Sequence, residues 1–144
     1  MLFRSKVVVC GGGLSGTECA LELAYKGHDV TVVDMLPAAQ FAKDAAPSPY
    51  TMLHALLKKH GVKLLGDSKV ISISADSIEL IDRELNHRFI EANTVVNALG
   101  MRPNSEVVNL FSDLIPEVYV IGDAASVGNM RHATASAFIP AVEC

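Results

Sequence analysis

The sequence predicts an α/β fold: a Rossmann-like domain of three layers, with a central parallel sheet and an antiparallel β-meander insert. Short apolar, β-branched runs alternate with helical patterns, as is typical of parallel strands that are buried on both faces. A glycine-rich turn, GGGLSG, joins the first such strand to the first helix. Three short, partly alternating segments at 69–74, 77–82 and 86–90 then interrupt the pattern and predict the antiparallel meander.

The N-terminal segment predicts one βαβ unit. Residues 6–10 (KVVVC) are expected to form a buried strand, and apolar residues at helical spacing predict a helix over 14–26. Gly27 supplies the signal that ends this helix. Residues 29–34 (DVTVVD) form the second strand, so that the strand, the turn, the helix and the strand together make a right-handed βαβ crossover.

The middle of the chain predicts a loop and three further elements. Three prolines and many alanines in residues 35–50 indicate a loop. A helix is expected over 51–60 and a third parallel strand over 62–66. After the meander, residues 94–100 (TVVNALG) return to the pattern of a buried strand.

The C-terminal segment is less regular. A polar stretch leads to residues 118–122 (VYVIG), which we expect to be another buried strand. Residues 130–144 look helical, but Pro140 should end or kink this helix, because proline lacks the amide hydrogen and clashes with the preceding turn.

Composition and charge exclude several classes of function. The 144 residues are 50% apolar and 19% charged, so they bury the core of one modest domain. The net charge is −4 without a block of Lys or Arg, which argues against a nucleic-acid partner. No apolar run approaches the roughly 20 residues of a membrane span, and we see no signal peptide. We therefore expect a cytoplasmic chain with no membrane partner.

The cysteines and histidines predict neither a disulfide framework nor a metal centre. The three cysteines lack CxxC or zinc spacing, which favours a reducing compartment. The five histidines are scattered, and their spacing matches no metal site.

The strongest functional signal is the spacing of Gly11, Gly13 and Gly16 between a strand and a helix. The first glycine allows a tight turn, the second lets the backbone approach a pyrophosphate, and the third lets the helix pack close to the strand. The helix N-terminus then faces the phosphates with its free amides and the positive end of its dipole. The alternatives are a tight turn without a ligand and a methyltransferase-type Rossmann domain. The three-glycine spacing and the antiparallel insert disfavour the latter.

Two acidic residues accompany this fingerprint. Asp34 ends the second strand, where it is placed to accept hydrogen bonds from both ribose hydroxyls; the alternative is a strand-end charge that faces water. Because residues 35–42 contain no Arg or Lys for a 2′-phosphate, we predict NAD(H) rather than NADP(H). Glu18 lies near the start of the helix and is either a residue favoured there by the dipole or a carboxylate beside the nicotinamide.

Three segments in this order carry a family resemblance: VVVCGGGLSGTECALELAYKGHDVTVVD, NALGMRPN and PEVYVIGDA. They resemble the C-terminal part of the NADH:flavin oxidoreductases related to 2,4-dienoyl-CoA reductase and trimethylamine dehydrogenase, which contain a pyridine nucleotide-disulphide oxidoreductase-type NAD-binding domain. The resemblance implies that this domain is inserted in an FAD-binding domain. It also implies that Glu18 lies near the nicotinamide and that Gly122 and Asp123 contact FAD. For Asp123 the alternative is a helix N-cap.

The fingerprint and the resemblance together predict the site and the domains. The residues expected at the NAD(H) site are Gly11, Gly12, Gly13, Leu14, Ser15, Gly16, Asp34, Met35 and Gly100. Residues 1–100 are expected to be the NAD(H)-binding domain, and residues 101–144 an incomplete remnant of an FAD-binding domain. The opening half of that domain, the FMN barrel and the cysteines of an iron–sulfur cluster are absent from the sequence. We therefore expect a fragment of a longer enzyme.

The expected function is that of an NADH-binding module, which delivers hydride from NADH to a flavin in the intact oxidoreductase. The isolated chain is expected to be inactive. The alternative is a stand-alone NAD(H)-binding or sensing module without catalysis. The bare edges of the strand expected at 118–122 predict a homo-oligomer.

Overall fold

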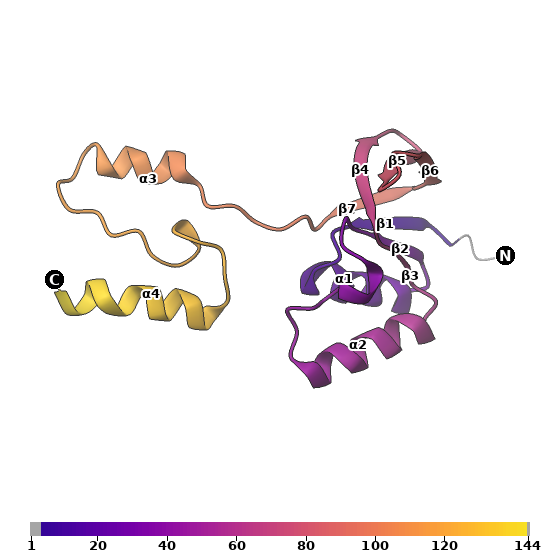
Figure 1. Ribbon diagram of the computed structural model, residues 1–144, viewed down its shortest axis with the longest axis horizontal. Coiled ribbons are helices and arrows are strands. Elements are labelled where there is room, and N and C mark those ends of the chain that lie inside the picture. The colour runs from indigo at the N-terminus through magenta and orange to yellow at the C-terminus, as the bar shows by residue number, and fades with distance from the viewer. Residues whose placement is uncertain (1–3, 144) are drawn as a thin grey trace. The chain divides into compact units, whose positions relative to one another are not determined.

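Four parallel strands form the central sheet of the N-terminal half of the chain. They are β1 (Lys6–Cys10), β2 (Asp29–Val33), β3 (Lys63–Leu65) and β7 (Thr94–Asn97). Their order is β3-β2-β1-β7, with β1 between β2 and β7 and every pairing parallel. The predicted parallel sheet is therefore confirmed, and it is visible in Figure 1.

The computed structural model describes residues 4–143, without the side chain of Glu143. The chain consists of two compact units, Met1–Gly100 and Met101–Cys144. The whole sheet belongs to the first unit.

Helices cover one face of the parallel sheet. The two helices are α1 (Leu14–Tyr25) and α2 (Pro47–Lys59). Their buried side chains form one core cluster with those strand residues that point to this face, such as Val7 and Val9 of β1. Burial of each valine stabilises the fold by about 1.5–3 kcal/mol.

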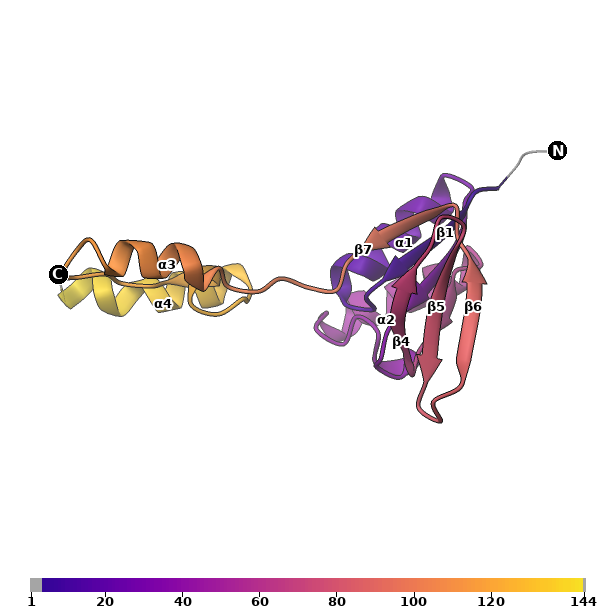
Figure 2. The ribbon, with the colours of Figure 1, turned by 90° about the horizontal axis from the view of Figure 1, so that it is seen from above.

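The antiparallel meander covers the opposite face. It consists of β4 (Ser68–Ile73), β5 (Ser77–Asp82) and β6 (His87–Glu91), which pair in the order β4-β5-β6 as a separate sheet (Figure 2). Residues of β5 pack with the alternate side chains of β1, Val8 and Cys10, in a second core cluster. Because side chains alternate across a strand, β1 contributes to both clusters, and this produces the three expected layers.

The largest differences from the sequence predictions in the first unit concern α2, the loop before it and β7. Helix α2 begins at Pro47 rather than at residue 51. Proline fits the first turn of a helix, because the amides of that turn have no carbonyl partner within the helix and the missing hydrogen costs no bond. A short 3₁₀ helix, η1 (Ala38–Gln40), interrupts the loop before it. Strand β7 ends at Asn97, and the two following residues that were expected to be buried, Leu99 and Gly100, are exposed.

The second unit contains α3 (Ser105–Ser112), a 3₁₀ helix η2 (Gly122–Ala124) and α4 (Met130–Glu143). The prediction of a buried strand over 118–122 is wrong. Within the described part of the chain, no strand pairs with this segment, and its side chains are mostly exposed. An apolar, β-branched run has strand propensity, but it becomes a strand only when a neighbouring strand pairs with it, and none of the described strands does so here.

Helix α3 was not predicted from the sequence, whereas α4 lies in the segment that was predicted to be helical. The polar stretch before residue 113 contains α3, which begins after Asn104; the side chain of Asn104 caps it by accepting from the amide of Val107 at 3.4 Å. Helix α4 contains Pro140 and continues past it to Glu143, so the proline does not end the helix. The expectation for residue 144 lies outside the described residues.

Candidate dinucleotide-binding site

The turn after β1 is tied to both neighbouring strands. The amide of Gly11 donates to the carbonyl of Val33 in β2 at 2.8 Å, and the amide of Ala98, just after β7, donates to the carbonyl of Cys10 at 2.7 Å. Gly11 has a φ of +122°, and a Cβ there would lie 2.1 Å from the carbonyl oxygen of Ala98. Only glycine therefore allows this turn.

The other two glycines of the spacing have opposite surroundings. A Cβ on Gly16 would lie 2.0 Å from the carbonyl oxygen of Gly11, so this glycine lets α1 pack against the turn. A Cβ on Gly13 would meet nothing within 4 Å. Gly13 is the N-cap of α1 and provides no side-chain cap. The helix N-terminus is thus open on the side of Gly13, as close approach of a phosphate requires.

Asp34 holds the turn from the end of β2. Its Oδ2 accepts a hydrogen bond from the amide of Gly12 at 2.6 Å, and its Oδ1 accepts one from the amide of Leu36 at 2.9 Å. Asp34 therefore does not simply face water. A carboxylate offers about four lone-pair positions, so two of them stay available for hydroxyl donors.

Phe41, which the sequence pattern did not mark as a site residue, lies beneath this turn. Phe41 is fully buried, and a Cβ on Gly12 would lie 2.7 Å from the Cδ1 atom of its ring. The amide of the next residue, Ala42, donates to the carbonyl of Gly12 at 2.8 Å. A signal was present in the sequence, because Phe41 is a large apolar residue within a segment otherwise predicted to be a loop.

The other residues of the predicted NAD(H) site follow β1, β2 or β7 along the chain. Leu14 is half-buried and Ser15 is exposed in the first turn of α1, Met35 is exposed after Asp34, and Gly100 is exposed with a φ of +92°. The turn and its acidic partner are thus recognisable in the sequence, whereas the aromatic residue beneath them is not.

Glu18 is exposed on α1, four residues after the first residue of the helix. The first turn of α1 contains no acidic residue, so a purely electrostatic role at the helix start is not supported. Glu18 lines a groove of about 340 Å³ between α1 and α2, together with Tyr25 and Met52.

Gly122 and Asp123 belong to the second unit. Gly122 is buried with a φ of +57°, and its amide donates to Oγ of Ser136 at 2.9 Å. Oδ1 of Asp123 accepts from the amide of Gly128 at 3.0 Å. Asp123 is not an N-cap, because the residue before α4 whose side chain accepts from that helix is Asn129. One oxygen of Asp123 thus stabilises a local turn.

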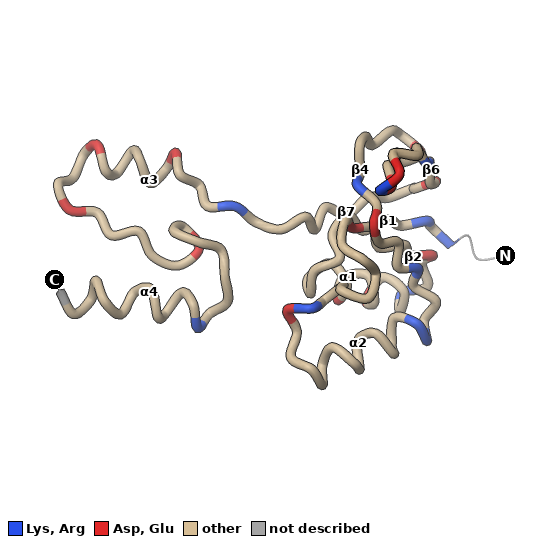
Figure 3. Tube along the Cα trace, in the orientation of Figure 1, with Lys and Arg blue, Asp and Glu red and all other residues tan. Residues whose placement is uncertain are grey.

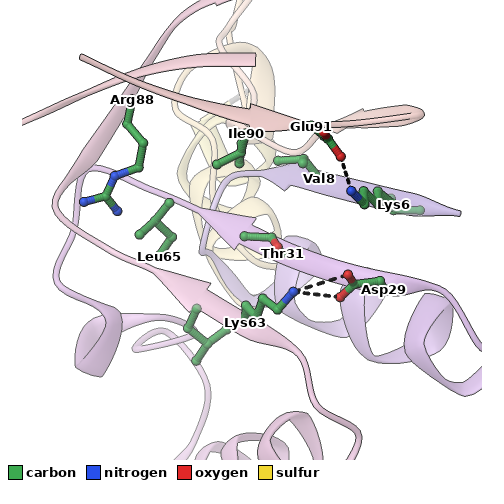
Figure 4. Close-up of a pocket in the computed structure, with 11 residues that line it drawn as sticks. Lys6, Val8, Asp29, Thr31, Lys63, Leu65, Arg88, Ile90 and Glu91 are labelled. Carbon is green, nitrogen blue, oxygen red and sulfur yellow. Dashed lines mark hydrogen bonds and ion pairs between the residues drawn. The ribbon is translucent and has the colours of Figure 1, made fainter. Parts of the chain in front are cut away.

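A cavity of about 450 Å³ lies between the parallel strands and β6, and it includes the first residues of β1 and β2 (Figure 4). Ion pairs flank it: Lys63 lies 3.1 Å from Asp29, and Lys6 pairs with Glu91. Ligands of open α/β sheets bind outside the carboxyl ends of the strands, whereas this cavity lies at the amino ends of β1 and β2. It is not part of the candidate dinucleotide site.

Cys10 is not suited to thiol chemistry, and the described residues show no group of metal ligands. Cys10 is buried and unpaired, and burial raises the pKa of its thiol, which disfavours the reactive thiolate. No three His, Cys, Asp or Glu side chains within residues 4–143 are grouped so as to hold a metal ion.

Figure 3 shows basic residues interspersed with acidic ones along the chain. No helix of the described chain is both long and apolar enough to cross a membrane.

The parallel sheet, the covering helices and the glycine turn define a Rossmann-like α/β domain. The sequence profile of the pyridine nucleotide-disulphide oxidoreductase family matches residues 2–137. The chain therefore belongs to the pyridine nucleotide-disulphide oxidoreductase family.

Similar proteins are much longer than this chain. It is 37% identical over 135 residues to an NADH oxidase of Thermoanaerobacter brockii, a match that covers 92% of this chain and 20% of that protein. It is 36% identical over 118 residues to a bilirubin reductase of Mediterraneibacter gnavus, covering 82% of this chain and 18% of the relative. The chain thus spans about a fifth of the length of these relatives.

Solved structures show the same arrangement. A 2-naphthoyl-CoA reductase complex matches with a TM-score of 0.78 and 26% identity, over 96% of this chain and 21% of that one. A histamine dehydrogenase from Rhizobium sp. 4-9 matches with a TM-score of 0.81 over 96% of this chain and 23% of its own. At 21% identity, the second likeness shows the fold alone.

Proposed function

We propose that the chain is the NADH-binding module of a longer, flavin-dependent oxidoreductase, of the NADH:flavin oxidoreductase type related to 2,4-dienoyl-CoA reductase and trimethylamine dehydrogenase. Residues 1–100 bind NAD(H), and residues 101–144 are an incomplete part of an FAD-binding domain. The observation that carries this proposal is the open N-terminus of α1 at Gly13, beside a carboxylate fixed at the end of β2. The similarity to longer reductases and to an NADH oxidase supports it.

The residues of the turn fit a dinucleotide. The space beyond Gly13, which a Cβ would enter without touching the protein, admits a pyrophosphate to the amides at the start of α1. The two unused lone-pair positions of Asp34 accept the ribose hydroxyls, while its negative charge repels a 2′-phosphate. The site therefore prefers NADH to NADPH.

The chemistry requires few side chains of this chain. NADH supplies a hydride, which the flavin of the longer enzyme accepts. Glu18 lies beside the nicotinamide end of the site, and the module's own contribution is to bind and orient the dinucleotide. This chain contributes Gly122 and Asp123 to the FAD site, and the rest of the enzyme completes that site. The FMN and the iron–sulfur cluster are held by other parts of the longer enzyme.

A stand-alone NAD(H)-binding or sensing module is the second candidate. The observation that favours it is that the turn, Asp34 and Phe41 all lie within residues 1–100, so the nucleotide site does not require a flavin. The two candidates differ in whether the module donates its hydride to an attached flavin domain.

Calorimetric titration of the purified chain with NADH and, separately, with NADPH tests the proposal. We expect NADH to bind and NADPH to bind at least about tenfold more weakly, since a charge conflict of this kind costs more than about 1.4 kcal/mol. The matched variant is Gly13→Ala, whose methyl group meets no protein atom but occupies the pyrophosphate position. It should keep the fold and lose NADH binding. Tighter binding of NADPH, or undiminished binding of NADH by Gly13→Ala, would contradict the proposal.

Flavin absorbance and NADH oxidation separate the two candidates. The purified chain should be colourless and should not oxidise NADH with an artificial electron acceptor. When residues 1–144 are expressed within the longer polypeptide, the flavin-module proposal expects NADH-dependent bleaching of the flavin. A longer polypeptide that binds NADH without flavin reduction supports the sensing module instead.

A further inference from the structure

We propose that residues 36–45, here called the strap, hold the glycine turn in its binding conformation, and that Phe41 and His54 are positioning residues for the dinucleotide. The binding part of this inference rests on the proposed function. Its structural part does not, because it concerns contacts within the chain. Neither residue is expected to touch the reacting atoms.

The strap contacts Gly12 in two ways. The buried ring of Phe41 lies where a side chain on Gly12 would otherwise be, with its Cδ1 2.7 Å from the ideal Cβ position. The amide of Ala42 donates to the carbonyl of Gly12 at 2.8 Å. On the other side, the amide of Gly12 donates to Asp34 at 2.6 Å. Both polar groups of Gly12 are therefore fixed, and they set the direction in which the chain enters α1.

Helix α2 in turn holds the strap. Nε2 of His54 lies 2.9 Å from the carbonyl oxygen of Phe41. Because a carbonyl only accepts, Nε2 must carry the hydrogen. The hydroxyl of Tyr50 donates to the carbonyl of Ala39 at 2.6 Å, and the rings of Tyr50 and His54 pack with centroids 4.3 Å apart. Two side chains one helical turn apart thus fix the backbone within η1 (Ala38–Gln40) and directly after it.

Ala42 shows that this arrangement is imposed by its surroundings. It is fully buried and has a φ of +54°, a left-handed conformation that non-glycine residues rarely adopt. The carbonyl of the preceding residue, Phe41, is bonded to His54, and the amide of Ala42 itself donates to Gly12. The backbone of Ala42 is therefore held on both sides. Strain of this kind persists only where neighbouring contacts determine the backbone, and such positions cluster at binding sites.

The consequence for binding is preorganisation. A turn that is already ordered loses less conformational freedom when the dinucleotide binds, so the affinity is higher. Release of the strap should weaken binding without removing any group that touches the ligand.

The experiment compares His54→Leu with His54→Gln and with the control His60→Leu. Glutamine keeps an amide donor for the Phe41 carbonyl, whereas leucine does not. His60 follows the end of α2 and packs against Tyr25 with ring centroids 4.4 Å apart, so the control loses a similar ring contact away from the strap. The readouts are hydrogen exchange at the amides of Gly12 and Ala42, measured by NMR, and NADH affinity, measured by calorimetry.

For His54→Leu we expect exchange at both amides to rise about tenfold and NADH affinity to fall about five- to tenfold. His54→Gln should restore most of both, and His60→Leu should change neither. The inference is overturned if His54→Leu leaves the exchange unchanged, or if His60→Leu has the same effect, since that would indicate general loosening of α2. Equal NADH affinity despite faster exchange would refute the positioning role.

Two further results would each have a defined meaning. If the unchanged chain does not bind NADH, the proposed function fails, and the exchange data alone decide whether the strap holds the turn. If His54→Leu does not fold, Tyr50→Phe takes its place, because it removes only the hydroxyl bonded to Ala39. Faster exchange at Ala42 in Tyr50→Phe supports the strap, and unchanged exchange overturns it.

Discussion

The glycines of the turn after β1 differ in what surrounds them. The positions that a Cβ would take on Gly11, Gly12 and Gly16 are occupied by other protein atoms, whereas that on Gly13 is empty. Three of the four are therefore required by the fold itself, and the fourth is required only if a ligand approaches. The turn thus contains glycines that the fold requires, Gly11, Gly12 and Gly16, and one glycine, Gly13, that only a bound ligand would require.

At the residue scale, Gly16→Ala should destabilise the chain severely. Its methyl group would lie 2.0 Å from the backbone oxygen of Gly11, which cannot move without breaking the turn. We expect a loss of about 3 kcal/mol or more in the free energy of unfolding, measured with urea. Gly13→Ala, at a φ of −67°, should stay within about 1 kcal/mol of the unchanged chain. Equal stability of the two variants would show that α1 does not pack on the turn as described.

At the element scale, α2 is held by one face. Leu57 is fully buried in the cluster between the helices and the sheet, whereas Met52 on the same helix is 63% exposed. Leu57→Ala should reduce the free energy of unfolding by about 2–5 kcal/mol. Met52→Ala should change it by about 0.5 kcal/mol at most. Urea unfolding followed by circular dichroism measures both, and similar losses would mean that α2 is packed differently.

The ion pair of Lys6 and Glu91 joins the central sheet to the meander (Figure 4). The hydrogen bond and the charge of Lys6 lower the pKa of Glu91 from its ordinary 4.5, and those of Glu91 raise the pKa of Lys6 above 10.5. The stabilisation is therefore present between these two values. It is lost as the pH falls through the lowered pKa of Glu91, or rises through the raised pKa of Lys6.

Glu91→Gln should consequently lower the melting temperature slightly at neutral pH, and this effect should fade as the pH falls through the lowered pKa of Glu91, because the protonated side chain no longer pairs with Lys6. The effect should shrink in salt, because both side chains are exposed. Glu84→Gln, in the turn between β5 and β6, is the control. A difference that persists at acidic pH would exclude this electrostatic explanation.

At the scale of the whole molecule, the two units differ in their cores. Both core clusters lie within residues 1–100, while Gly122 is the single buried residue among those described from 101 to 142. A chain that ends at Gly100 should therefore fold and bind NADH about as tightly as the full chain, within a factor of about two. Loss of NADH binding by the truncated chain would show that the second unit takes part in the nucleotide site.

The second unit exposes many large apolar side chains, among them Leu110, Phe111, Leu114 and Phe138. Apolar surface of this kind usually lies at an interface. We therefore predict that the full chain forms a homodimer or larger oligomer, whereas the chain that ends at Gly100 is monomeric. Light scattering at micromolar concentration measures both masses, and a monomeric full chain contradicts the prediction.

Much of the first unit could be predicted because its signals are local. The period of apolar residues is visible in short windows, and glycine spacing identifies a turn without knowledge of the rest of the fold. The boundaries of α2 and β7 were less accurate, because the chain on either side of them is arranged by packing. The strand expected over 118–122 was wrong for a related reason, since a strand depends on a partner that an apolar run alone does not provide.

The sequence by itself determined the parallel sheet, the meander and the glycine turn with Asp34, since each depends on the pattern of neighbouring residues. The tertiary structure alone decided how that turn is held. Phe41 and His54 are separated along the chain and act through one buried ring and one backbone carbonyl. Such contacts have no periodic signature, because they arise only when the loop after β2 folds back between β1 and α2.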